Sequence, residues 1–181
     1  HLKTFFIFLI LFAVSKSEQK KLSITSHNGQ IVFSFDIKNG HPEYAVKYKN
    51  QSLIEHSSLG LSFINNDSFG SDIQMGKAII SDGVDDYTLP EGKTSKVHDI
   101  YKEASIPMQE MNDKKRLVIL HVKAFNDGVA FRYEFPEQKN WDNYTLTDEN
   151  TNFNIVGNPT ATVGFLENFT TSHKHRYSVS Q

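Results

Sequence analysis

The sequence predicts an all-β domain, folded as a β-sandwich, on three observations. Short runs of alternating apolar and polar residues recur from residue 22 onward, and turns rich in Gly, Asn, Asp and Pro separate them. Fourteen Phe and seven Tyr suit pleated, half-buried surfaces. No stretch shows a convincing helical period of 3.6 residues. With 181 residues, the chain is long enough for one domain with a sizeable core.

The first strands are expected at residues 22–27 and 30–37, on either side of Asn28-Gly29, which is a strong hairpin signal. In the second of these strands, four apolar residues alternate with polar ones, so one face lies in a core and the other in water. The apolar residues are Ile31, Phe33, Phe35 and Ile37. Further short strands are expected at residues 43–48 and 52–56.

The clearest strand pair is expected at residues 116–125 and 129–135, joined by Asn126-Asp127-Gly128. Both faces of the first strand carry apolar residues, which is typical of a central strand in a sandwich. Gly128 is interpreted as a turn residue that adopts a positive φ.

Residues 102–111 contain Pro107, which argues against a helix because a proline inside a helix costs about 3 kcal/mol. A strand is the better interpretation, with the proline at an edge or a bulge.

The N-terminus has the order of a secretory signal peptide over residues 1–17. Lys3 precedes a short apolar run, small residues follow, and the run is shorter than the roughly 20 residues that span a bilayer. The protein is therefore expected to be exported, either periplasmic or secreted, with no membrane attachment after cleavage. The chain has no cysteine, which excludes thiol nucleophiles and thiolate metal sites.

The chain has no excess of positive charge that would attract nucleic acid. The formal net charge is −2, so nucleic-acid partners are not expected.

Two segments resemble the N-terminal domain of glycoside hydrolase family 97. They are residues 87–103, which begin Tyr-Thr-Leu-Pro-Glu-Gly-Lys-Thr-Ser, and residues 125–136, which read Phe-Asn-Asp-Gly-Val-Ala-Phe-Arg-Tyr-Glu-Phe-Pro. The resemblance implies a β-super-sandwich of the galactose mutarotase-like kind over residues 22–181, incomplete at its C-terminal end.

The resemblance also implies a function. Enzymes of this family are α-glucosidases or α-galactosidases, in which the N-terminal domain packs on the mouth of a catalytic (β/α)₈ barrel and completes a pocket for an α-linked oligosaccharide or glycan. A calcium ion lies in the active site of the complete enzyme. This chain shows no barrel, so we expect no hydrolase activity from it alone. The alternative is a free-standing, secreted carbohydrate-binding module.

The C-terminal tail holds most of the candidate site residues, which are expected to bind sugar or face the barrel. The resemblance places a calcium-binding glutamate in this loop, and the aligned position here is Lys174, a cation that cannot ligate calcium. A different register would bring Glu167 to that role. His173 and Tyr177 are further candidates, and His173 with His175 makes only a weak metal pair.

Trp141 is the remaining candidate, because an aromatic face suits the C–H face of a hexose. No carboxylate pair is selected as catalytic: Asp85 and Asp86 are adjacent and point in different directions, and Glu134 is expected on a solvated strand face. Arg132 is expected in a salt bridge, with a carboxylate such as Glu134 or Asp127, or facing solvent, and the alternative is contact with a sugar. We therefore assign no catalytic residue and no metal ligand.

Overall fold

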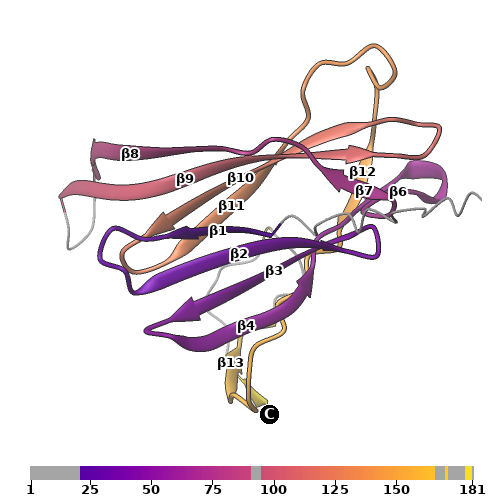
Figure 1. Cartoon of the computed structure of the whole chain (residues 1–181). Coiled ribbons are helices and arrows are strands. Elements are labelled where there is room, and N and C mark those ends of the chain that lie inside the picture. The colour runs from indigo at the N-terminus through magenta and orange to yellow at the C-terminus, as the bar shows by residue number, and fades with distance from the viewer. Residues whose placement is uncertain (1–20, 91–94, 166–169, 171–177, 181) are drawn as a thin grey trace, which may run out of the picture.

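The computed structural model describes residues 21–90, 95–165, 170 and 178–180, and its strands form two facing sheets with smaller additions (Figure 1). The strands are β1 Leu22–Thr25, β2 Ile31–Lys38, β3 His41–Tyr48, β4 Gln51–Ser58, β5 Leu61–Phe63, β6 Asp67–Phe69, β7 Ile73–Met75, β8 Ile79–Thr88, β9 Lys96–Glu110, β10 Leu117–Phe125, β11 Val129–Glu134, β12 Leu146–Glu149, β13 Ala161–Val163 and β14 Ser178–Ser180. One 3₁₀ turn, η1, covers Ile64–Asn66.

The two main sheets are antiparallel and form the layers of a sandwich (Figure 1). One sheet has the order β1-β2-β3-β4. In the other, β11, β10 and β9 are neighbours, and β7 and β8 pair in turn with the far side of β9. A small sheet, β12-β5-β6, adjoins one end of the sandwich, and β13 pairs with β14. The prediction of an all-β sandwich is confirmed.

The core lies between the two sheets, where the predicted alternation places apolar side chains. On β2, Phe33 and Phe35 are at most 1% exposed. They face four residues of β10 that are 0% exposed, namely Val118, Leu120, Val122 and Ala124. Because burying one large apolar side chain stabilises a fold by about 1.5–3 kcal/mol, these two strands supply much of the stability.

Strand β9 accommodates Pro107 at an irregularity in its pairing. The strand is confirmed, and although it pairs with β10 without a shift of register, on its other side residues 76–78 lie opposite only residues 106 and 107, between the pairings with β7 and β8. The carbonyl of Pro107 accepts a hydrogen bond from Gly76 N (2.8 Å), just after β7 ends and before β8 begins. The missing N–H of the proline points to the same side as its carbonyl, so it falls at the break between two partner strands.

The β10–β11 hairpin forms as predicted, with one correction at its turn. Phe125 N donates to Gly128 O (2.9 Å), which closes the turn. Among the described residues the glycines with a positive φ are Gly29, Gly40, Gly70 and Gly157, so the positive φ expected for Gly128 is wrong. The predicted turn at Asn28-Gly29 does have that geometry, and it is tied to the β10–β11 turn because Asn28 N donates to Asn126 Oδ1 (2.9 Å).

Residues 150–156 form a strap along the outer edge of β4 and its continuation into β5. Three alternating asparagines hold it through their side chains: Asn150 donates to Ser62 Oγ, Asn152 to Ser58 Oγ and Asn154 to His56 O. Backbone bonds run beside them, such as Val156 N to Leu53 O (2.9 Å). The strap thus satisfies an edge that would otherwise be open to pairing with another chain.

The other face of the strap lies against the five-stranded sheet. Thr151 hydrogen bonds with the hydroxyl of Tyr133, and Phe153 stacks on Phe131. Burial of Tyr133 raises the pKa of its hydroxyl to about 12.

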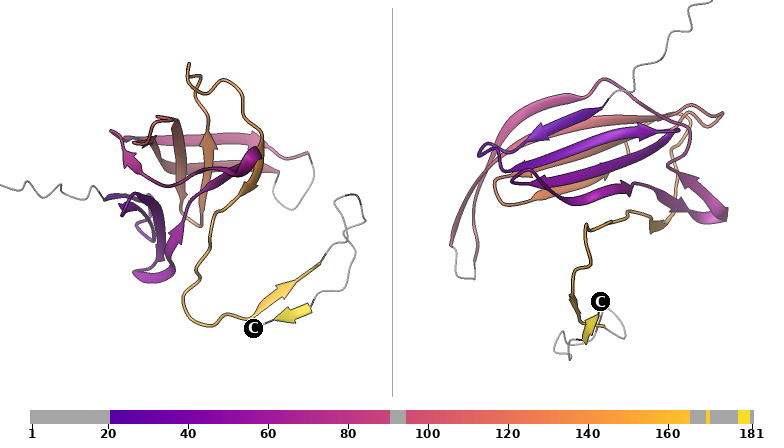
Figure 2. Two further views of the ribbon diagram at one scale, coloured as in Figure 1. Left: turned by 90° about the vertical axis from the view of Figure 1, so that its right-hand side faces the viewer. Right: turned by 60° about the horizontal axis from the view of Figure 1, so that its bottom comes forward.

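The β13–β14 hairpin stands away from the sandwich (Figure 2). The flanking Phe165 is 73% exposed and Val179 of β14 is 69% exposed. Among the described residues, no helix is long and apolar enough to cross a membrane.

Gly83 on β8 provides a test of the packing between β8 and β9. A Cβ at this position would lie 2.4 Å from ring atoms of Tyr101, which is 8% exposed and pairs with Gly83 across the strands. Gly83→Val is expected to lower the free energy of unfolding by about 1–3 kcal/mol, because the ring must move. Gly128→Ala is the control, since a Cβ there meets nothing within 4 Å. Equal urea midpoints for the two variants would contradict this packing.

Candidate functional site

The structure places one of the five sequence-predicted site residues. Trp141 lies within the described part of the chain, in the segment between β11 and β12. Glu167, His173, Lys174 and Tyr177 lie outside the described residues, as does the predicted signal peptide at residues 1–17. The roles assigned to all of them stay predictions.

Trp141 belongs to a cluster of four aromatic rings at one end of the sandwich. Its ring centroid lies 5.1 Å from that of Phe63, 5.5 Å from Phe135 and 5.0 Å from Tyr144. The guanidinium of Arg116 lies 4.9 Å from the Trp141 centroid, which is a cation–π contact. These contacts hold Trp141 in place, while Tyr144 is 46% exposed and is the more accessible ring of the two.

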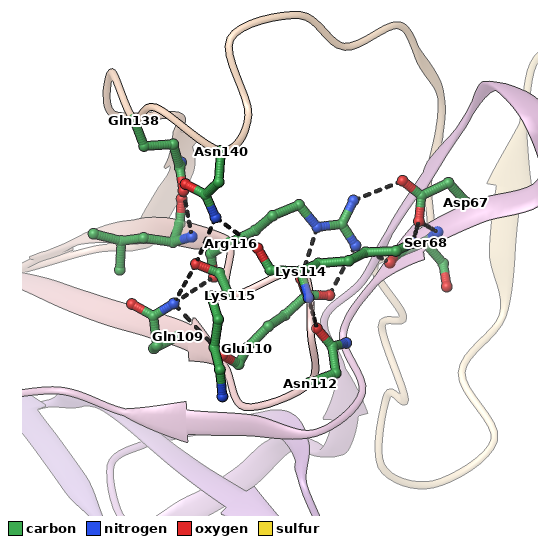
Figure 3. A network of polar contacts seen from close by, with 11 residues as sticks. Asp67, Ser68, Gln109, Glu110, Asn112, Lys114, Lys115, Arg116, Gln138 and Asn140 are labelled. Carbon is green, nitrogen blue, oxygen red and sulfur yellow. Dashed lines mark hydrogen bonds and ion pairs between the residues drawn. The ribbon is translucent and has the colours of Figure 1, made fainter.

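Arg116 is the centre of a buried polar network (Figure 3). Its side chain is 2% exposed and binds both carboxylate oxygens of Glu110, which is 1% exposed, at 2.7 and 2.8 Å. Its remaining donors reach Asp67 Oδ2 (2.7 Å) and the carbonyl of Ser68 (2.6 Å). A buried arginine is stable only when its donors are satisfied, and here they are shared between β6 and the β9–β10 turn.

Asp67 joins this network to the surface. Burial alone would raise the pKa of its carboxyl, but the ion pairs with Lys114 and Arg116 outweigh burial and lower that pKa below 3.8. The carboxylate is therefore charged at neutral pH and stabilises the folded state there.

A second polar cluster lies on the outer face of the five-stranded sheet, around His121. Its Nε2 lies 2.6 Å from Glu134 Oε2 and its Nδ1 lies 3.0 Å from Ser105 Oγ. Arg132 Nη2 is 3.9 Å from the same Glu134 carboxylate and its side chain is 66% exposed, so Arg132 combines the salt bridge and the solvent-facing position that the sequence left open. This network links three neighbouring strands.

The neighbouring carboxylates on β8 are also engaged. Asp85 binds Lys123 Nζ (2.8 Å) and the hydroxyl of Tyr101 (3.1 Å), whereas Asp86 binds His98 (2.6 Å). They point in different directions, as the strand alternation predicts. The described residues contain no group of three His, Asp or Glu side chains that could hold a metal ion.

The mouth groove is an open cleft between the β10–β11 turn and the sheet of β2, β3 and β4, with about 1050 Å³ of space that is continuous with solvent. Its apolar side is formed by Ile31, Val46, Ile54 and Val129. The sequence alone did not indicate it, because its residues come from four separated segments. Nor did it indicate the buried role of Arg116; a charged residue at the start of an apolar strand was the available signal.

A family model and solved structures indicate one family. The family model described as Glycosyl-hydrolase 97 N-terminal matches residues 24–181. A glycoside hydrolase family 97 enzyme from Pseudoalteromonas sp. strain K8, solved with panose and with acarbose, has a TM-score of 0.69 and 26% identity over 75% of this chain. A crystal structure of a beta-arabinopyranosidase has a TM-score of 0.73 at 19% identity over 87% of this chain, which is a likeness of fold. The chain spans 20% and 26% of the lengths of these two proteins.

Removing Arg116 tests the buried network. Arg116→Ala leaves the buried Glu110 carboxylate unpaired, and we expect a loss of about 3–5 kcal/mol in the free energy of unfolding. The fluorescence of Trp141, the single tryptophan, should also shift as its ring loses the guanidinium. Lys114→Ala is the control, because Lys114 binds Asp67 at the surface and should cost less than about 1 kcal/mol. Similar losses for both variants would contradict a buried hub.

Asp67 predicts a specific dependence of stability on pH. Because its folded pKa is lowered, its contribution is present above the pKa of the unfolded chain and disappears as pH falls through the folded value. Asp67→Asn should therefore be less stable than the natural chain at pH 7, and the gap should shrink below about pH 4. Urea unfolding from pH 7 to pH 2 measures this, and a gap independent of pH would refute it.

Proposed function

The chain belongs to the glycosyl-hydrolase 97 N-terminal family, and on this premise we propose that it serves an exported family 97 glycoside hydrolase that cleaves α-linked sugars. In this proposal the domain shapes the substrate pocket, and the catalytic barrel is a separate part of the enzyme. The observation that carries the proposal is the family match over residues 24–181. Export rests on the signal-like residues 1–17.

The solved relatives support a division of labour. The Pseudoalteromonas enzyme was solved with panose and with acarbose, and this chain spans 20% of its length. In the described part of this chain, Asp67, Asp85 and Glu110 are tied to lysine or arginine. Such carboxylates are poor candidates for the paired acid and base of glycoside hydrolysis, so catalysis is assigned to the remainder of the enzyme.

The β13–β14 hairpin supports contact with another folded body. It projects from the sandwich (Figure 2) and exposes Phe165 and Val179. A two-stranded hairpin is at best marginally stable alone in water, so packing against a neighbouring domain would stabilise it. We assign that neighbour to the barrel.

Calcium does not enter the role of the described residues. They offer no cluster of three ligands, and the cation Lys174 occupies the aligned position of the family glutamate. Glu167 is the alternative, outside the described residues. In this proposal the barrel supplies the calcium ligands.

A chimera tests the pocket role. The matching segment of the Pseudoalteromonas enzyme is replaced by residues 22–181, and hydrolysis of panose is compared with that of the intact enzyme and of one lacking the segment. We expect the chimera to retain hydrolysis with an altered KM, the deletion to lose it, and the 181-residue chain alone to show none. Hydrolysis by the chain alone, or full activity of the deletion, would overturn the proposal.

A further inference from the structure

We propose that the mouth groove binds a neutral pyranose sugar. The groove lies at the β10–β11 turn, whereas Arg116 and the aromatic cluster lie at the other end of β10. Nine strand residues separate the two ends, which corresponds to roughly 30 Å. The inference does not depend on the pocket role of the domain.

The apolar side of the groove matches the C–H face of a pyranose ring. Ile31 and Val46 are 5% and 8% exposed and belong to the packed core, which holds their side chains in place. Val129 packs partly against the same core. At the rim, Tyr48 and Leu53 are 37% and 45% exposed. An aromatic ring beside an aliphatic wall is a surface on which sugars dock, because their C–H groups are apolar.

Polar groups that match sugar hydroxyls lie beside this wall. Asn126 uses its Oδ1 to accept from Asn28 N, so its amide is oriented, and its Nδ2 has no partner within the described part of the chain. The side chains of Gln30 and Asp127 likewise have no partner among the described residues. A side-chain amide can donate a hydrogen bond to one sugar hydroxyl and accept one from its neighbour. A carboxylate can accept hydrogen bonds from two neighbouring hydroxyls.

The charge of the groove selects a neutral ligand. Asp127 is the charged residue in its described lining, and at the rim Lys49 Nζ lies 5.0 Å from the centroid of the Tyr48 ring, so neither sign of charge dominates and a charged ligand is not favoured. A protein strand is disfavoured as the occupant, since the outer edge of β4 already bonds to the strap through Glu55 N to Asn154 O (3.1 Å) and Val156 N to Leu53 O (2.9 Å). The groove therefore fits a small, uncharged, polyhydroxylated ring.

Titration of the ¹⁵N-labelled full chain with panose, followed by NMR, tests this inference. We expect the amide signals of Tyr48, Leu53 and Gly128 to shift with a common dissociation constant. Tyr48→Ala should weaken that constant about tenfold, because it removes the rim ring. Tyr144→Ala is the matched control, with the same substitution at an exposed ring in the aromatic cluster, and it should bind as the natural chain does.

Three outcomes would contradict sugar binding in the groove. Absence of shifts, shifts confined to the aromatic cluster, or loss of binding in Tyr144→Ala alone would overturn the proposal. If Tyr48→Ala fails to fold, Leu53→Asp at the exposed rim replaces it, and the shift map of the natural chain still locates the site. Because binding is measured without hydrolysis, failure here leaves the chimera experiment unaffected, and the reverse also holds.

Discussion

The buried ion pair between Arg116 and Glu110 is the interaction on which one end of the sandwich depends. Both side chains are at most 2% exposed, so their charges are stable only while they remain together and fully hydrogen bonded. The same guanidinium binds Asp67 and contacts the ring of Trp141, so a single group fixes the β9–β10 turn, β6 and the segment that follows β11. The aromatic cluster thereby has a defined position.

The other end of the sandwich is organised by hydrogen bonds of neutral groups. Asn28 and Asn126 join the β1–β2 and β10–β11 turns through two hydrogen bonds, and the asparagines of the strap saturate the edge of β4. Among the described residues, the side chain of Gln30 has no hydrogen-bond partner at this end, whereas at the charged end Arg116 donates four hydrogen bonds. The two ends thus differ: the polar groups of the first are engaged in a structural network, whereas the second has polar side chains without a partner among the described residues.

Sequence reasoning predicted the layers because alternation and turn chemistry are local properties. The 116–125 and 129–135 pair and the Asn28-Gly29 hairpin were correct to within one or two residues at most of their ends. Strands β5 to β8 were not predicted from the sequence. Three of them have three residues each, and β8 is largely exposed, so none carries a full alternating pattern. The positive φ expected for Gly128 was wrong, because the hairpin closes through Phe125 N to Gly128 O without it. The Arg116 hub and the mouth groove could not be predicted, since each joins segments that are distant in sequence and meet only after folding.

The differences between the two ends of the sandwich bear on how a domain can support an enzyme without supplying its catalytic residues. An acid or base in catalysis needs a carboxyl group that can gain or lose a proton near the working pH, but the ion pairs of Asp67 and Asp85 lower the pKa of both. What such ion pairs provide instead is rigidity, which allows a surface built on them to hold its shape against a neighbouring domain. A β-sandwich stabilised in this way at one end, with a projecting hairpin and an open groove elsewhere, has the rigid surface that the proposed supporting role requires.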